Sequence, residues 1–334
     1  MKGIRLIAVV LLFSLLGRAQ SRSASYTFID YQRSFPRIND ALKRIEDTLI
    51  SQFRQRNLEW PAKYIYLRSF KYDSQLEVWI KYQKEEKFQL FKTYKVCALS
   101  GSLGPKRMQG DYQVPEGFYY INEFNPNSNY HLSLGLNYPN LSDRILADSL
   151  QPGGDIYIHG SCVTTGCIPI TNNQIEELYV LASHARNEGQ DFIPVHIFPV
   201  KFDHTRSAEY LKRFLLDYPE YIPFNAKLKQ AYYYFQRSRQ LPLIMVDPNG
   251  DYILDENASA DVPFEDAVAM RKDEEGECGD EEICEEDLAR VMDIQPEYPG
   301  GLTQFQQFLD GLSREVADFL YVDQDKANIM VEFI

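Results

Sequence analysis

The spacing of apolar residues predicts a helix close to the N-terminus. Between residues 36 and 57 they recur at every third or fourth position, at Ile38, Leu42, Ile45, Leu49 and Phe53. This period places them on one face of a helix, with charged residues on the other. Pro36 suits the first turn, because proline lacks the N–H that would be unpaired there. We expect this helix to pack on the domain that follows.

The segments that come next are rich in aliphatic, aromatic and β-branched residues, which is typical of strands. Residues 65–70 and 76–80 predict a hairpin, and further strands are expected at 88–99, 118–121 and 195–199. Glycine-rich turns separate several of these runs. Short strands at this spacing predict a mainly β fold with flanking helices (α+β), built on a β-sandwich or barrel-like core.

The pattern changes again after residue 204. Residues 207–240 have apolar positions at helical spacing and are rich in Tyr, Phe, Lys and Arg. The turn sequence 247–250 (Asp-Pro-Asn-Gly) separates two short apolar runs and predicts a hairpin. We expect residues 205–256 to form a helical cap and a hairpin.

The first residues have the pattern of a signal peptide. Lys2 and Arg5 are followed by an apolar run from Leu6 to Leu16, and small residues end at Ala19. The run is shorter than a membrane span needs. We expect cleavage that removes residues 1–19, no stable membrane span, and an exported protein in the periplasm or at the cell wall. Residues 20–57 would then form an N-terminal helical segment.

Charge is concentrated in one segment of the chain. The 334 residues have a net charge of −13, and residues 261–290 contribute −10 of it through thirteen Asp and Glu against three Lys and Arg. High charge and few aromatic residues predict a disordered linker over 257–290. The rest of the chain is close to neutral, so nucleic acid is not an expected partner.

Candidate chemistry is concentrated between residues 155 and 170. An alternating apolar run predicts a buried strand that ends at His159, and Cys167 follows eight residues later. Thr171 is a suitable N-cap for a helix just beyond. The N-terminus of a helix favours negative charge, and therefore a thiolate at Cys167 and an oxyanion beside it. His159 is the obvious base for such a nucleophile, although a single Cys/His pair at this spacing is more often structural.

The chain has five cysteines, at positions Cys97, Cys162, Cys167, Cys278 and Cys284. An odd number leaves at least one unpaired. Cys278 and Cys284 flank an acidic run and could pair with each other. Cys162 could pair with Cys167, but we expect it to be a small buried residue, with a reversible redox cap as the alternative. A zinc site made from Cys162, Cys167 and His159 lacks the second Cys/His pair that such sites use, so we expect no metal and no cofactor.

The run from 155 to 170 resembles the catalytic motif of YkuD-type L,D-transpeptidases. It is most similar to that of their YafK-like branch, His-Gly-x-Cys-Val-Ser-x-Gly-Cys, which it matches at His159, Gly160, Cys162, Val163, Gly166 and Cys167. Further landmarks of the family lie at 101–106, 110–111 and 115–117, and residues 130–140 are similar to the branch almost residue for residue. The likeness covers roughly residues 58–204, which we expect to be the catalytic domain.

The resemblance implies roles for the motif residues. Cys167 would attack a peptide carbonyl, His159 would transfer the proton, and the main-chain carbonyl of Gly160 would orient the imidazole. The N–H groups of the turn at Thr165 and Gly166 would stabilise the oxyanion. The candidate substrate-binding residues are Tyr130, His131, Tyr138 and Thr164. For His131 a structural role, bonded to a main-chain carbonyl, is an equal alternative.

The implied substrate is a peptidoglycan stem peptide, cleaved between an L- and a D-centre through a thioester acyl-enzyme. An amine acceptor gives transpeptidation, whereas water gives hydrolysis. Thr165 replaces a histidine of the standard signature and Pro169 replaces an arginine, so an amidase or peptidase, or release of wall-linked groups, is the first alternative. A catalytically silent wall-binding module is the second, and retention of both His159 and Cys167 argues against it.

A second resemblance lies in the tail. Residues 295–301, followed by Phe305 and Phe308, are similar to the opening of a TonB C-terminal domain. The chain stops before the further strands of such a domain. We therefore expect residues 291–334 to be a partial copy, and a candidate contact for a protein partner.

Overall fold

A computed structural model describes residues 27–259. Two helices come first, α2 (Phe28–Arg33) and α3 (Pro36–Gln55). Pro36 opens α3, and the apolar stripe at Ile38, Leu42, Leu49 and Phe53 is buried. The predicted amphipathic helix is therefore confirmed, because this stripe packs against the core that follows.

Eight strands form one mixed sheet in the order β3-β2-β1-β8-β4-β5-β6-β7. They are β1 (Tyr64–Phe70), β2 (Gln75–Lys81), β3 (Gln89–Lys95), β4 (Gly117–Asn125), β5 (Ser133–Leu136), β6 (Tyr157–His159), β7 (Ile168–Pro169) and β8 (Ile193–Phe198). The predicted hairpin is confirmed, since β1 and β2 pair antiparallel. The strand expected over 88–99 is shorter than predicted, and β8 joins the sheet parallel to β1.

The remaining elements lie between and after these strands. They are α4 (Leu141–Leu146), α5 (Asn172–Asn187), α6 (Thr205–Asp217), the short 3₁₀ turn η1 (Pro219–Tyr221), α7 (Ile222–Ser238), β9 (Pro242–Val246) and β10 (Tyr252–Ser259). The strands β9 and β10 pair antiparallel in a sheet of their own. The helical stretch and the hairpin predicted after residue 204 are thus both present.

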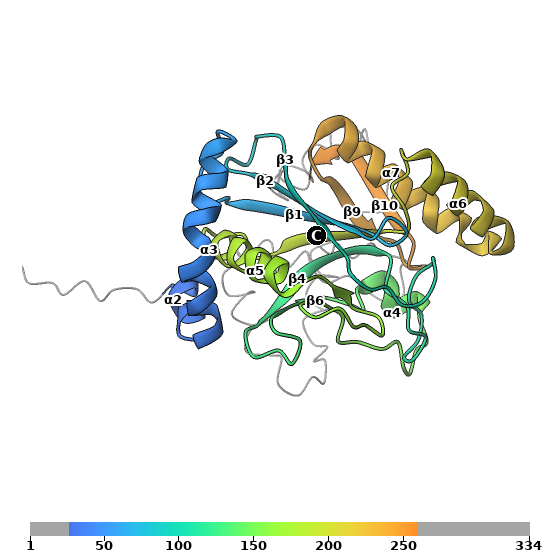
Figure 1. Cartoon of the computed structure of the whole chain (residues 1–334). Helices are drawn as coiled ribbons and strands as arrows, with labels where there is room; N and C mark the ends of the chain where they lie inside the picture. The colour runs from blue at the N-terminus through green and yellow to red at the C-terminus, as the bar shows by residue number, and fades with distance from the viewer. Residues whose placement is uncertain (1–26, 260–334) are drawn as a thin grey trace, which may run out of the picture.

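Helices cover the sheet on two sides (Figure 1). In β1, Ile65 and Leu67 belong to the apolar cluster that includes α3 and α5. Tyr66 and Phe70 belong to clusters that include α7. Neighbouring residues of a strand point to opposite faces, so this central strand is buried on both faces. The expected α+β class, mainly β with flanking helices, is confirmed.

The sheet curls until its two ends meet. Cys97, just after β3, donates its N–H to the carbonyl of Pro169 in β7 at 3.0 Å. Cys97 also forms a disulfide with Cys162, in the loop between β6 and β7, with the two Cα atoms 5.4 Å apart. The expectation that Cys162 is a small buried residue is therefore wrong, because Cys162 is exposed and disulfide-bonded. The pairing escapes sequence reasoning because 65 positions separate the two cysteines.

The boundaries near the ends of the described chain need one correction. The linker expected from residue 257 begins too early, because β10 continues to Ser259, which pairs with Pro242. The signal peptide, the rest of the acidic segment, Cys278, Cys284 and the TonB-like tail lie outside the described residues. Over 27–259, none of the helices has the length and apolar character to cross a membrane.

Candidate active site

His159 lies at the end of β6 with a ring that is almost fully buried. Its Nδ1 is 2.5 Å from the carbonyl oxygen of Gly160. A carbonyl can only accept a hydrogen bond, so Nδ1 carries the hydrogen and Nε2 keeps its lone pair. Burial lowers the pKa of His159 below its usual value. The ring is therefore neutral near pH 7, with Nε2 ready to accept a proton.

Cys167 immediately precedes β7 and shares a sheet face with His159. In the parallel ladder Ile158 pairs with Ile168 and His159 with Pro169, so Cys167 stands opposite Tyr157. Residues two apart in a strand point to the same side. The Sγ atom accepts the N–H of Tyr157 at 3.4 Å and donates to the carbonyl of Asp155 at 3.5 Å. The thiol is thus held by the main chain of the preceding strand.

The electrostatics of the thiol differ from the sequence-based expectation. Helix α5 begins five residues after Cys167, and β7 lies between them. Burial raises the pKa of the Cys167 thiol above its usual value, and the N–H of Tyr157 lowers it only in part. The prediction that a helix N-terminus favours a thiolate here is therefore wrong. The site instead presents a protonated thiol that needs a base.

The turn before the cysteine is fixed by Thr164. Its Oγ1 accepts the N–H of Gly166 at 3.1 Å and donates to the carbonyl of Cys167 at 2.8 Å. Gly166 has φ +146°, and a Cβ there would lie 3.1 Å from the carbonyl oxygen of Gln113. Because the Gly166 N–H already donates to Thr164, the N–H groups of Thr165 and Cys167 are the candidate oxyanion donors. Thr164 therefore holds the turn, and its contact with substrate stays a prediction.

Gly160 is required by close packing. A Cβ at this position would lie 2.7 Å from Oδ1 of Asn172 and 2.8 Å from the carbonyl oxygen of Tyr130. The same Asn172 oxygen accepts the N–H of Ser161 at 2.9 Å. The close approach brings the start of α5 and the 130–131 turn against the segment that orients His159.

Tyr130 and His131 occupy this turn but have different surroundings. The ring of Tyr130 is half exposed and lies over the ring of His159, with centroids 4.7 Å apart. The Nε2 atom of His131 is 2.6 Å from a carboxylate oxygen of Glu176 in α5. Arg44 of α3 binds the other oxygen of Glu176 at 2.6 Å. His131 thus has a structural contact, although its partner is a carboxylate where a main-chain carbonyl was expected.

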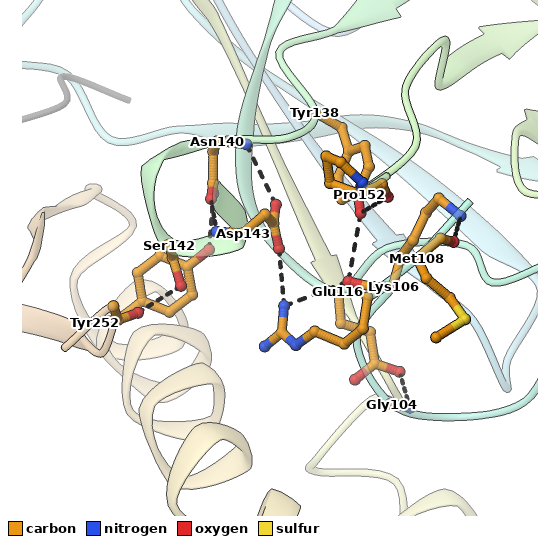
Figure 2. A network of polar contacts seen from close by, with 12 residues as sticks. Gly104, Lys106, Met108, Glu116, Tyr138, Asn140, Ser142, Asp143, Pro152 and Tyr252 are labelled. Carbon is orange, nitrogen blue, oxygen red and sulfur yellow. Dashed lines mark hydrogen bonds and ion pairs between the residues drawn. The ribbon is translucent and has the colours of Figure 1, made fainter. Parts of the chain in front are cut away.

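An open cleft of about 490 Å³ adjoins the cysteine. It is lined by Lys106, Gln109, Gly110, Leu150, Gln151, Pro152, Gly153, Gly154, Asp155, Ile156, Thr165, Gly166 and Cys167. Of the predicted site residues only Thr165, Gly166 and Cys167 lie in its wall. Tyr138 is buried behind the wall, where its hydroxyl donates to the carbonyl of Pro152 at 2.9 Å (Figure 2). It therefore supports the cleft from outside, which contradicts its predicted contact with substrate.

A buried polar network continues behind this wall (Figure 2). Arg107 lies 3.1 Å from the carboxylate of Asp143 in α4, and Tyr119 donates to the other oxygen at 2.8 Å. Burial raises the pKa of Asp143 to about 6. Asn140 donates to the hydroxyl of Tyr252 at 2.8 Å, which ties the network to the C-terminal hairpin. The 106–111 segment is thus anchored from two sides.

Two groups at the site were missed by the sequence reasoning. Cys97 gave no signal, because its partner is far away in sequence. Lys106 stands in the Gly-Pro-Lys landmark, so a signal existed, but only the structure places it beside Cys167. The zinc trio considered above is not formed, because Cys162 is in a disulfide. Among residues 27–259 no group of three or more His, Cys, Asp or Glu is arranged to hold a metal ion.

Comparison with known proteins identifies the family. Residues 73–197 match the model of the YkuD L,D-transpeptidase catalytic domain. The protein named "Putative L,D-transpeptidase YafK" of Escherichia coli (strain K12) is 34% identical over 200 residues, which cover 59% of this chain and 76% of that protein. The chain belongs to the L,D-transpeptidase family. The same identity and coverage hold for YafK of Escherichia coli O157:H7.

Solved structures give weaker likenesses to this L,D-transpeptidase family member. The helical cell shape determining protein Pgp2 of Campylobacter jejuni is 20% identical, with a TM-score of 0.33 over 54% of this chain and 72% of that one. Bd1075 of Bdellovibrio bacteriovorus is 22% identical, with a TM-score of 0.31 over 48% of this chain and 58% of that one. Membership of the family therefore rests on the sequence comparisons.

Proposed function

We propose that this protein is an exported L,D-transpeptidase that acts on peptidoglycan stem peptides through a cysteine thioester. The observation that carries the proposal is the pairing of β6 with β7. It supports the proposal because the strand that ends at His159, whose Nδ1 bonds a main-chain carbonyl, lies beside the strand that follows Cys167, a thiol in the wall of an open cleft. Family membership supplies the reaction class, and the leader-like residues 1–19 support export.

The first half of the reaction forms the acyl-enzyme. The peptide carbonyl enters the cleft beside Cys167, and Nε2 of His159 takes the thiol proton as Sγ attacks. The N–H groups of Thr165 and Cys167 stabilise the oxyanion, each donor worth about 3–4 kcal/mol in comparable enzymes. As the intermediate collapses, the C–N bond breaks and the protonated His159 gives its proton to the leaving amine. A thioester on Cys167 remains.

The second half transfers the acyl group. An acceptor amine loses a proton to His159, attacks the thioester and releases the thiol, which gives a new peptide bond. Water in place of the amine gives a shortened peptide. The carbonyl of Gly160 holds the imidazole in one tautomer through both halves, because it can only accept from Nδ1. The chemistry uses only groups of this chain and the two substrates.

The proposal is tested with purified muropeptides and the chain from residue 20 to 334. Products are read by mass spectrometry with a labelled D-amino acid as acceptor. Cross-linked dimers or label exchange that disappear in Cys167→Ala and His159→Gln support transpeptidation. His204→Gln is the matched control, because His204 is an exposed histidine at the start of α6.

Two other outcomes have distinct meanings. Peptides that gain water and depend on Cys167 would show that the same thioester chemistry serves a hydrolase. An acid-quenched protein without an acyl adduct on Cys167, together with unchanged muropeptides, would refute the enzyme proposal and leave the wall-binding module.

A further inference from the structure

The cleft beside Cys167 carries two charged side chains in its wall, Lys106 and Asp155. They differ in their surroundings. Lys106 is 5% exposed, whereas Asp155 is exposed to solvent. Water and salt screen an exposed charge far more than a buried one. Both charges act on the thiol of Cys167, since Asp155 raises its pKa and Lys106 lowers it.

Lys106 is held in one position by fixed acceptors. Its Nζ donates to the carbonyl of Met108 at 2.7 Å (Figure 2) and to the carboxylate of Asp111 at 2.5 Å. An ammonium group has three N–H donors, and these two bonds use two of them. The third donor belongs to a side chain that lines the cleft.

The carboxylate of Asp111 does not compete for that third donor. Its oxygens accept the N–H groups of Arg107, Met108 and Gln113, at 2.9, 3.1 and 3.0 Å. The group is therefore turned toward the main chain of its own loop, and Asp111 is absent from the cleft wall. Asp111 holds the lysine in place and takes one of its three donors.

Glycines keep the space around Lys106 open. A Cβ on Gly153, which has φ +85°, would lie 2.9 Å from Cε and 3.3 Å from Nζ of Lys106. The neighbouring Gly154 has no atom within 4 Å of the place of its Cβ. The main chain at Gly153 thus packs on the end of the lysine side chain, and a side chain there would collide with it.

The cleft therefore combines a nucleophile with one fixed, buried cation. We propose that Lys106 is the group of this cleft that binds a carboxylate of the substrate peptide beside Cys167. This inference rests on the proposed function for the identity of the peptide. The anion site itself does not depend on the reaction, and it is tested separately below.

The electrostatic part is tested with two alkylating reagents that differ in charge. Iodoacetate is anionic and iodoacetamide is neutral, and both react with the thiolate, so the ratio of their rates at Cys167 cancels the pKa of the thiol. A charge a few ångströms from the thiol in a partly shielded site changes this ratio roughly three- to tenfold. We expect Lys106→Met to lower the ratio of iodoacetate to iodoacetamide by that factor.

Matched variants separate charge from structure. Lys92→Met removes a lysine that pairs with Glu177 on another part of the protein and should leave the ratio unchanged. Asp155→Asn should raise the ratio, and Lys106→Arg should keep it near the wild-type value. If Lys106→Met does not fold, as read from its melting curve, the last two variants still test the sign of the field. An unchanged ratio in Lys106→Met, or a fall in Asp155→Asn, overturns the proposal.

The recognition part uses a pair of donor peptides that end in a carboxylate or a carboxamide. The wild type should prefer the carboxylate peptide through a lower KM, and Lys106→Met should lose most of this preference with a smaller change in kcat. An equal preference in both proteins refutes the carboxylate site. A protein that turns over neither peptide but shows the expected alkylation ratios refutes the proposed reaction and supports the anion site.

Discussion

The disulfide between Cys97 and Cys162 should be a major source of stability. It joins the chain after β3 to the loop between β6 and β7, so it fastens the two ends of the curled sheet. With the two cysteines 65 positions apart, the entropy of loop closure in the unfolded chain gives a stabilisation of about 4 kcal/mol at 25 °C. For a domain of this size that corresponds to a fall of about 10 °C in Tm when the bond is removed.

The assay is urea unfolding of the oxidised chain from residue 20, compared with the Cys97→Ala/Cys162→Ala double variant. Cys167→Ala is the control, because it removes a cysteine that lies outside the disulfide. We expect the double variant to lose most of the 4 kcal/mol and the control to lose little. A loss below about 1 kcal/mol would refute the reasoning, because the bond would then not constrain the unfolded chain. So would alkylation of Cys162 in the oxidised, unfolded protein.

Four further predictions concern the site and the network behind it. The rate at which iodoacetamide alkylates Cys167 should increase with pH and reach its midpoint above pH 9, because burial raises the pKa of the thiol. A midpoint below pH 7 would instead indicate an ion pair with His159. The acid limb of turnover should lie below pH 6.5, because burial lowers the pKa of His159, which must be neutral to act as a base. Gly160→Ala should cost about 1–3 kcal/mol of stability in the same unfolding assay, because its Cβ would lie 2.7 Å from the side-chain oxygen of Asn172. Gly154→Ala is the control and should be close to neutral, because its Cβ would have no atom within 4 Å. Burial raises the pKa of Asp143 to about 6, so the folded state binds the proton of this carboxyl more tightly than the unfolded chain does. The stability that the bound proton contributes, about 3 kcal/mol at most, is therefore lost as the pH rises from 4 to 7. Asp143→Asn should remove that part of the pH dependence, and an identical pH profile in variant and wild type would contradict the assignment.

Local patterns in the sequence were enough for most of the elements. A stripe with helical period predicts α3, and two short runs rich in apolar and aromatic residues on either side of a polar turn predict the β1–β2 hairpin, because both signals lie within a few residues. The motif around His159 and Cys167 could be found in the same way, since both residues lie in one continuous segment. The tautomer of His159 follows from a carbonyl one residue away, so it too is a local property.

The sequence by itself therefore determined the α+β class, the family motif and the candidate nucleophile with its candidate base. Only the tertiary structure decided which distant groups stand beside them. Cys97 meets Cys162 because the sheet curls until β3 and β7 are neighbours, Lys106 reaches the cleft because its loop packs on 148–154, and Tyr138 is turned away behind that wall. The order of strands in a curled sheet is set by packing across the whole core, and no short-range pattern records it.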